Sequence, residues 1–223
     1  MRITAFNGSP KGKNSNTNLL VEAFLAGAKA AGAETHNVFL IEKHIQHCTG
    51  CFACWFKTPG TCVLQDDMAE LLALYKQSDV VVFATPVYLW NMTACLKNFL
   101  DRLIPIKSPT VTHKDDNFDM ANNLNKMPDV VIISNAGFPG DNNFQTMKEV
   151  MKSAHPILEI YRNCGMALRS KDEHVHAQAT EYLAAVEEAG FCTAKRTGYE
   201  DALKDRLNKA LLPIGEYVKL VMG

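Results

Sequence analysis

Residues 79–85 read Asp-Val-Val-Val-Phe-Ala-Thr, a continuous run of β-branched and apolar side chains. Such a run is typical of a strand buried on both faces of a parallel sheet. Residues 129–134, Asp-Val-Val-Ile-Ile-Ser, repeat the pattern. Weaker runs predict further strands at residues 2–6 and 35–40, and a short last strand at 166–169.

Apolar residues at helical spacing lie between these strands. They predict a helix over 19–31 that Gly32 ends, another after Asp66 and Asp67, and a third over 94–103. A long helix is expected over 144–164, with a bend at Pro156. Residues 108–126 are polar without a clear period, which indicates a loop near the ligand edge of the sheet. Strands alternating with helices predict an α/β fold, a doubly wound parallel five-stranded sheet with helices on both faces.

Composition and charge exclude several classes of protein. The chain has 223 residues, 47% of them hydrophobic, and a net charge of −1. These values are typical of a globular protein and give no broad field for nucleic acid. No apolar run is long enough to span a membrane, and no signal peptide is expected. We expect a cytoplasmic protein with neither a nucleic-acid nor a membrane partner. It would form one domain over 1–223, with a cysteine-rich insertion near 44–65 and a helical tail near 173–223.

A polar loop follows the first strand, where doubly wound sheets bind ligands. It reads Gly-Ser-Pro-Lys-Gly-Lys-Asn-Ser-Asn-Thr over residues 8–17 and leads into the first helix. Glycine, hydroxyl groups and a helix N-terminus together suit a phosphate monoester. The spacing matches neither a dinucleotide loop nor a Walker loop. A solvated loop with ordinary helix capping is the alternative. The candidate phosphate-binding residues are Ser9, Lys11, Ser15, Asn16 and Thr17.

This loop resembles the phosphate loop of the NAD(P)H-dependent FMN reductase family, which has the flavodoxin-like fold. The segment Pro86-Val-Tyr-Leu-Trp-Asn-Met92 and the helix ending Phe99-Leu-Asp-Arg102 are similar to segments of that family. The resemblance implies that residues 86–92 hold the isoalloxazine ring of FMN. The candidate ring-binding residues are Pro86, Val87, Tyr88, Leu89, Trp90, Asn91 and Met92. Packing of Tyr88 and Trp90 in the core or at an interface is the alternative, and Asp101 and Arg102 are expected to form a structural or interface ion pair.

A third loop follows the strand over 129–134 and reads Ser-Asn-Ala-Gly-Phe-Pro-Gly. It lies at the same predicted edge of the sheet, because the carboxyl ends of parallel strands share one edge. We expect Asn135 and Gly137 to contact the far side of the flavin. Turns of this composition are common in proteins, so the loop is the weaker of the three signals.

Four of the seven cysteines crowd into residues 48–62, with two C-x-x-C steps in series. Such a run resembles the thiolates that hold a [4Fe–4S] cluster, and iron–sulfur flavoproteins carry a compact motif at this position. Cys48, Cys51, Cys54 and Cys62 are therefore candidate ligands. Two alternatives remain open: thiols without any metal, and a structural zinc ion, for which two separated knuckles are more usual.

The resemblance implies an FMN-dependent oxidoreductase with NAD(P)H as co-substrate and no catalytic side chain, because the flavin supplies the chemistry. Electrons would pass to a quinone, an azo or nitro compound, a flavin or a protein acceptor. A homodimer or a dimer of dimers is expected. One alternative is an iron–sulfur flavoprotein that takes electrons from ferredoxin. The other is a flavodoxin-type electron carrier without a small-molecule substrate, although flavodoxins are usually more acidic.

Overall fold

The computed structural model describes residues 1–114 and 117–222. At its centre is a parallel sheet with the strand order β2-β1-β3-β6-β7. These strands are β1 (Arg2–Asn7), β2 (Glu34–Phe39), β3 (Val80–Pro86), β6 (Asp129–Asn135) and β7 (Leu158–Arg162). Numbered within this sheet alone, the order is 2-1-3-4-5, which is the flavodoxin-like arrangement. The predicted fold class is confirmed.

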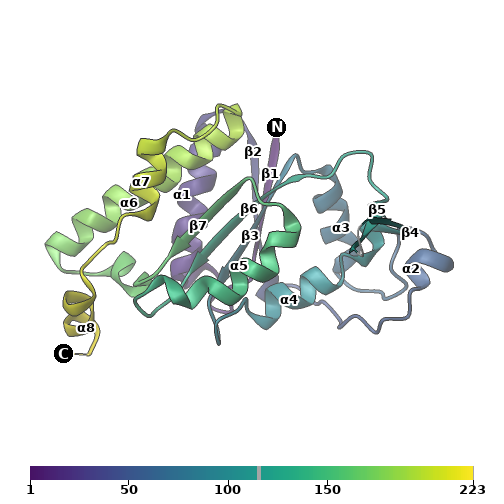
Figure 1. Cartoon of the computed structure of the whole chain (residues 1–223), viewed down its shortest axis with the longest axis horizontal. Helices are drawn as coiled ribbons and strands as arrows, with labels where there is room; N and C mark the ends of the chain where they lie inside the picture. The colour runs from purple at the N-terminus through teal and green to yellow at the C-terminus, as the bar shows by residue number, and fades with distance from the viewer. Residues whose placement is uncertain (115–116, 223) are drawn as a thin grey trace.

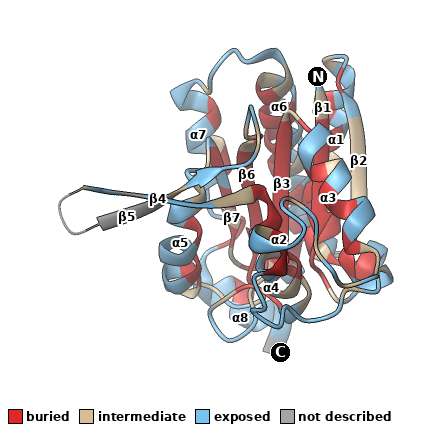
Figure 2. Ribbon diagram, turned by 90° about the vertical axis from the view of Figure 1, so that its right-hand side faces the viewer, coloured by how far each residue is buried: buried red, intermediate tan, exposed pale blue. Residues whose placement is uncertain are grey.

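Helices cover both faces of the sheet (Figure 1). One face packs against α1 (Asn16–Ala30) and α6 (Glu173–Lys195), and the other packs against α3 (Met68–Gln77), α4 (Ala94–Asp101) and α5 (Gln145–Met151). Successive residues of a strand point to opposite faces, so β3 contributes to both cores. Val80, Val82 and Ala84 belong to the α1 side, whereas Val81 and Phe83 belong to the α3 side. Figure 2 shows buried residues along the central strands β1, β3 and β6 and on parts of the helices, whereas the edge strand β2 is of intermediate burial.

The remaining elements lie outside these layers. They are α2 (Ala53–Phe56), the antiparallel pair β4 (Lys107–Lys114) and β5 (Asn117–Asn122), and the tail helices α7 (Asp201–Asn208) and α8 (Ile214–Met222). The β4–β5 pair extends away from the five-stranded sheet (Figure 2). Among the described residues, no helix combines the length and the apolar character needed to cross a membrane.

Three expectations about the elements are wrong. The long helix over 144–164 is instead α5 followed by the strand β7. His155 with φ of 48° and Pro156 separate the two elements, because neither continues a helix. The last strand is β7, and residues 166–169 belong to the short 3-10 helix Gly165–Arg169. The polar stretch over 108–126 contains most of the β4–β5 hairpin.

Candidate functional site

The loop after β1 is held tightly against the start of α4. A Cβ atom on Gly8 would lie 2.6 Å from the Cβ of Leu96, so a larger residue would displace α4. The Thr93 hydroxyl donates to the Gly8 carbonyl at 2.6 Å, and the Gly8 amide donates to the Ala84 carbonyl at 2.8 Å. These contacts fix the entry of the predicted phosphate loop against the neighbouring strand and helix.

Ser15 caps the N-terminus of α1. Its Oγ accepts from the Asn18 amide at 3.0 Å and donates to the Gly12 carbonyl at 2.8 Å. The free N–H groups of the first helical turn then give the loop its positive end. Ser9 is buried, and its Oγ accepts from the Lys11 amide at 3.4 Å. The hydroxyls of Ser9 and Ser15 therefore shape the loop and cap the helix.

Arg169 adds a cation that the sequence did not point to. It ends the 3-10 helix Gly165–Arg169 and is exposed. Its Nε donates to Oδ1 of Asn16 at 3.0 Å, and its Nη2 donates to the Ser15 carbonyl at 3.2 Å. The guanidinium thus lies at the N-terminus of α1, 153 residues away in sequence. No local motif marks it, because the contact depends on the position of the chain after β7.

The segment after β3 forms a two-residue β-turn with an unusual backbone. Tyr88 and Asn91 exchange two backbone hydrogen bonds of 2.9 and 3.1 Å. Between them, Leu89 and Trp90 have φ values of 45° and 62°. Asn and Gly are the usual residues when both central positions have positive φ, so two bulky residues here imply backbone strain.

This turn presents three large apolar side chains to solvent. Tyr88 is 49% exposed, Leu89 86% and Trp90 58%. The alternative that the two aromatics pack in the core is therefore wrong, and their packing at an interface stays a prediction. Met92 is buried, and Thr93 begins α4 by accepting from the Leu96 amide. The turn is thus fixed at its base and exposed at its tip.

The loop after β6 joins the other two. Oδ1 of Asn135 accepts from the Thr17 hydroxyl at 2.5 Å, and the Asn135 carbonyl accepts from the Val87 amide at 2.8 Å. Asn135 itself is only 6% exposed, so its side chain connects loops. The buried Tyr217 of α8 donates its hydroxyl to the Gly137 carbonyl. All three predicted ligand loops are therefore adjacent at the carboxyl edge of the sheet.

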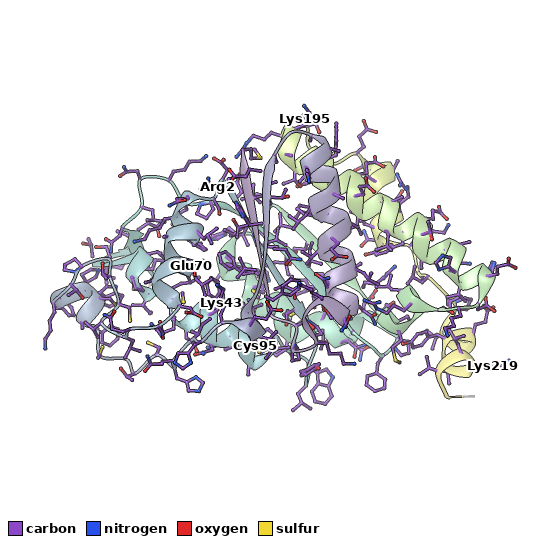
Figure 3. The ribbon with its side chains drawn as sticks, turned by 180° about the vertical axis from the view of Figure 1, so that it is seen from behind. Arg2, Lys43, Glu70, Cys95, Lys195 and Lys219 are labelled. Atoms are coloured by element: carbon purple, nitrogen blue, oxygen red, sulfur yellow. The ribbon has the colours of Figure 1, made fainter. Side chains whose placement is uncertain are left out.

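The cysteine-rich segment surrounds one cavity of about 350 Å³. All four candidate thiols line it, together with Arg102 and apolar residues. Cys54 is buried, Cys62 is half-buried, and Cys48 and Cys51 are exposed. The segment is attached to α3 at its start, where Lys43 and Glu70 form an ion pair of 3.3 Å (Figure 3). The topology therefore collects the whole run of cysteines around a single space.

Two of these thiols have opposite pKa shifts. Burial, followed by the neighbouring Cys62, raises the pKa of Cys54. The backbone N–H of Ala53, followed by the Thr49 hydroxyl, lowers the pKa of the Cys51 thiol. Across residues 1–114 and 117–222, no three His, Cys, Asp or Glu side chains lie close enough to hold one metal ion. The four thiols that would hold a cluster nevertheless line the same cavity.

Arg102, at the end of α4, contacts the same segment. It forms a buried ion pair of 2.7 Å with Asp66, and its Nη2 donates to Sγ of Cys62 at 3.4 Å. Asp101 instead pairs with Lys97 on the surface of α4. The predicted ion pair of Asp101 and Arg102 is therefore replaced by two separate pairs.

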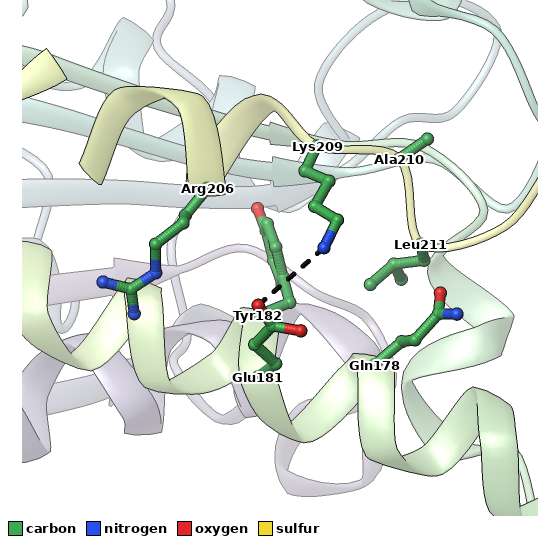
Figure 4. A pocket seen from close by; sticks show the side chains of 7 residues that line it. All are labelled: Gln178, Glu181, Tyr182, Arg206, Lys209, Ala210 and Leu211. Atoms are coloured by element: carbon green, nitrogen blue, oxygen red, sulfur yellow. Dashed lines mark ion pairs between the residues drawn. The ribbon is translucent and has the colours of Figure 1, made fainter. Parts of the chain in front are cut away.

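A second hollow lies far from these loops, between α6 and the chain after α7. It has room for about one water molecule, and Glu181 and Lys209 form a 3.8 Å ion pair at its rim (Figure 4). Tyr182 also lines it, with burial raising the pKa of its hydroxyl to about 12. The hollow is too small for a cofactor, so we assign it none.

Comparison with known proteins identifies relatives of this chain. The sequence model of the family described as NADPH-dependent FMN reductase matches residues 1–155. An iron-sulfur flavoprotein of Archaeoglobus fulgidus is 41% identical over 105 residues, which are 47% of this chain and 46% of that protein. One of Methanosarcina thermophila is 36% identical over 107 residues, 48% of this chain and 54% of that protein. The chain thus matches about half the length of these curated relatives.

Solved structures share the fold at low sequence identity. An FMN-dependent NADH-azoreductase of Bacillus anthracis, in complex with FMN, has a TM-score of 0.62 and 17% identity, covering 86% of this chain and 99% of that one. An NAD(P)H:quinone oxidoreductase of Methanothermobacter marburgensis has a TM-score of 0.60 and 17% identity, covering 86% and 96%. These similarities show the flavodoxin-like architecture.

Proposed function

The chain belongs to the NADPH-dependent FMN reductase family, and on this premise we propose that it binds FMN at the three adjacent loops and carries electrons. When bound, FMN supplies a ring that accepts a hydride and releases electrons. The observation that carries the proposal is the junction at Asn135, which joins the phosphate loop, the exposed aromatic turn and the loop after β6. Reduced nicotinamide is the proposed donor, and a quinone, an azo or nitro compound, a flavin or a protein is the proposed acceptor.

The phosphate of FMN would lie at the N-terminus of α1. The free N–H groups there carry partial positive charge, and Arg169 brings a full charge to the same helix end. Lys11 and Asn16 are exposed or half-exposed beside it, whereas Thr17 is buried and supports the loop through Asn135. Charge and geometry at this end therefore favour a dianionic group.

The ring of FMN would lie against the turn that carries Tyr88, Leu89 and Trp90. These side chains offer an apolar and aromatic surface to a flat conjugated ring. The positive φ values of Leu89 and Trp90 are a reason to expect function, because strained backbone is concentrated at binding sites. Pro86, Val87, Asn91 and Met92 would hold the turn in place, and Gly137 would approach the ring from the loop after β6.

An iron–sulfur flavoprotein is the second candidate, and the four-cysteine cavity favours it. Two exposed thiols, one half-buried thiol and one buried thiol around one space fit a group that bridges several thiolates. Cys48, Cys51, Cys54 and Cys62 would hold a [4Fe–4S] cluster, which would exchange single electrons with an external donor such as ferredoxin. Free thiols and zinc are the alternatives that metal analysis must separate.

Equilibrium binding of FMN and of riboflavin tests the first candidate. The two ligands share the ring and differ in the phosphate, so FMN should bind much more tightly to protein stripped of flavin. Protein purified without oxygen should also show a flavin spectrum. A colourless protein that does not bind micromolar FMN would overturn the proposal.

Reduction and metal analysis separate the two candidates. Bleaching of the flavin by NADPH or NADH supports the reductase, whereas reduction by ferredoxin alone supports the iron–sulfur flavoprotein.

Iron and sulfide in the anaerobic protein should be lost in Cys51→Ala, with FMN content retained. Cys95→Ala is the matched control, since Cys95 lies in the first turn of α4 and outside the cavity lining. Iron that persists in Cys51→Ala would remove Cys51 from the ligand set. Three expectations stay predictions: a single domain over residues 1–223, a homodimer or a dimer of dimers, and a cytoplasmic location.

A further inference from the structure

Arg102 is a buried cation beside the cysteine cavity. Its side chain is 1% exposed, and that of its partner Asp66 is 0% exposed. One guanidinium nitrogen, Nη1, bonds Oδ2 of Asp66 at 2.7 Å, while Nη2 bonds Oδ1 of Asp66 at 3.1 Å. This two-pronged contact is the geometry in which arginine pairs best with a carboxylate. Such a pair is expensive to bury, so its position calls for a role besides stability.

The same guanidinium contacts both ends of the cysteine segment. At the start, Nη1 donates to the Gln46 carbonyl at 2.6 Å. At the end, Nη2 donates to Sγ of Cys62 at 3.4 Å. Asp66 adds a second connection by accepting from the Gln46 amide at 2.9 Å. The two ends of the segment 46–66 are therefore held together by the Asp66–Arg102 ion pair. One of its four thiols, Cys62, also accepts a hydrogen bond from the guanidinium.

Both members of the pair stay charged. Burial opposes the charge of Asp66, but hydrogen bonds from Arg102 and from the amides of Gln46 and Met68 outweigh it and leave the pKa of Asp66 lowered. The guanidinium of Arg102 keeps its positive charge because an arginine side chain does not lose its proton in proteins. A fixed positive charge and a fixed negative charge consequently lie next to each other at the wall of the cavity.

We propose that Arg102 is a positioning residue that raises the reduction potential of a cluster held by the four thiols, and that Asp66 opposes it. The inference rests on the proposed cluster. One electron added to such a cluster adds one negative charge, which the guanidinium stabilises through its N–H bond to Cys62 and through its charge. Asp66 offsets part of this stabilisation because its carboxylate lies against the same guanidinium.

Two substitutions of opposite expected effect test the proposal. Asp66→Asn keeps the shape of the side chain and leaves the arginine charge without its counter-charge. The equilibrium constant for one-electron reduction should rise about tenfold, which is about 59 mV. Arg102→Gln removes the positive charge, and the constant should fall about tenfold. Arg102→Lys retains the positive charge but presents its donors from a single nitrogen. Its equilibrium constant for reduction should stay within about threefold of the wild type. A role in loop structure alone would move Asp66→Asn and Arg102→Gln in the same direction.

The measurement is an anaerobic redox titration followed by electron paramagnetic resonance, with iron, sulfide and FMN content determined for each variant. Arg206→Gln is the control, because Arg206 pairs with Glu188 on the surface. If Arg102→Gln fails to fold, the role of Arg102 is still tested by the other two variants. The reduction potential should rise in Asp66→Asn and should stay near the wild-type value in Arg102→Lys. Shifts below twofold, or shifts of the same sign, in variants that retain iron would overturn the role of Arg102. Wild-type protein that binds FMN but holds no iron or sulfide would overturn the cluster and this inference together.

Discussion

Arg169 brings positive charge to the N-terminus of α1, where the phosphate of FMN is proposed to lie. Its two hydrogen bonds go to uncharged oxygens of Asn16 and Ser15. Among the ion pairs of the described part of the chain, none involves Arg169. Its charge is therefore available to an anion at this position.

We expect Arg169→Ala to weaken FMN binding about tenfold, equivalent to about 1.4 kcal/mol, because a charge-assisted contact to the phosphate is lost. Riboflavin binding should not change, since riboflavin lacks the phosphate. Fluorescence titration of both ligands gives the comparison, and Lys171→Ala, at a neighbouring exposed position, serves as the control. Equal weakening of both ligands would contradict a phosphate contact.

Trp90 combines exposure with positive φ, so its replacement separates stability from binding. In Trp90→Gly, relief of the strained backbone should raise the stability of flavin-free protein by about 1 kcal/mol. The same change removes an aromatic face and should weaken FMN binding. Urea unfolding without flavin and FMN titration measure the two effects. Lower stability together with unchanged affinity would show that Trp90 is a structural residue only.

At the residue scale, sequence reasoning grouped residues that the structure brings together. The three candidate ligand loops and the cysteine run could be recognised because each is contiguous and each follows or neighbours a recognisable strand; that they bind FMN or a cluster stays a prediction. The contacts of Arg169 with Asn16 and of Arg102 with Asp66 and Cys62 run between segments that are distant in sequence. Single positions of this kind have no periodicity that could reveal them.

At the scale of the elements, α1 and α6 cross at very short distance. Two glycines, Gly27 and Gly190, permit this close approach. A Cβ on Gly27 would lie 1.7 Å from the carbonyl oxygen of Glu187, and one on Gly190 would lie 1.9 Å from that of Phe24. The two helix backbones therefore touch, and no side chain can relax to make room.

Gly27→Ala should destabilise the protein by at least about 1–3 kcal/mol, because overpacking forces the helices apart. Helix propensity alone predicts the opposite sign, a gain of about 1 kcal/mol. Gly215→Ala is the matched control, because a Cβ there would meet no atom within 4 Å. Chemical denaturation of the two variants checks the prediction, which fails if Gly27→Ala is as stable as the wild type.

Asp79 connects the starts of β1 and β3. Its carboxylate accepts from the Arg2 amide at 2.9 Å and pairs with Lys126 at 3.1 Å, and these contacts, the first above all, lower its pKa. The unfolded chain takes up this proton near pH 3.9, and the folded chain takes it up at lower pH. The stabilisation is thus complete above about pH 5, where both states are ionised, and is lost as pH falls through the unfolded-state and then the folded-state pKa.

Asp79→Asn should therefore be less stable than the wild type near pH 6, by no more than about 1 kcal/mol because the carboxylate is 37% exposed. The difference should shrink as the pH falls from 5 to 3. Urea denaturation of both proteins at several pH values measures it. A gap that widens on acidification would show that the carboxylate has no lowered pKa.

Element prediction failed where the local pattern was weak. β7 has only five residues and alternates buried with more exposed positions, so its apolar residues merged with the helical spacing of α5 before it. β4 and β5 pair with each other away from the main sheet, and β4 is rich in polar residues. A strand with many polar residues lacks the apolar run that identified β3 and β6.

At the scale of the whole molecule, the tail helices α7 and α8 pack against the domain that contains the five-stranded sheet. Leu203, Leu207, Leu211 and Leu212 are at most 5% exposed and pack in the same core as α1 and α6. Tyr217 joins that core and also holds the Gly137 carbonyl of the proposed site. Arg162 of β7 donates to the Lys209 carbonyl at 2.6 Å. The tail is therefore joined to the sheet by apolar packing and by hydrogen bonds.

A chain that ends at Tyr199 should consequently be too unstable to show a cooperative unfolding transition. Burying a leucine side chain contributes roughly 1.5–3 kcal/mol, so the loss of four reaches most of the roughly 5–15 kcal/mol by which domains are stable. A chain that ends at Leu212 keeps the leucines and loses α8; it should fold but bind FMN more weakly, because Tyr217 no longer holds Gly137. Thermal melts by circular dichroism and FMN titration compare both with the full chain. If the chain ending at Tyr199 melted as cooperatively and at the same temperature as the full chain, α7 and α8 would be an appendage, and the single domain predicted over 1–223 would end before them.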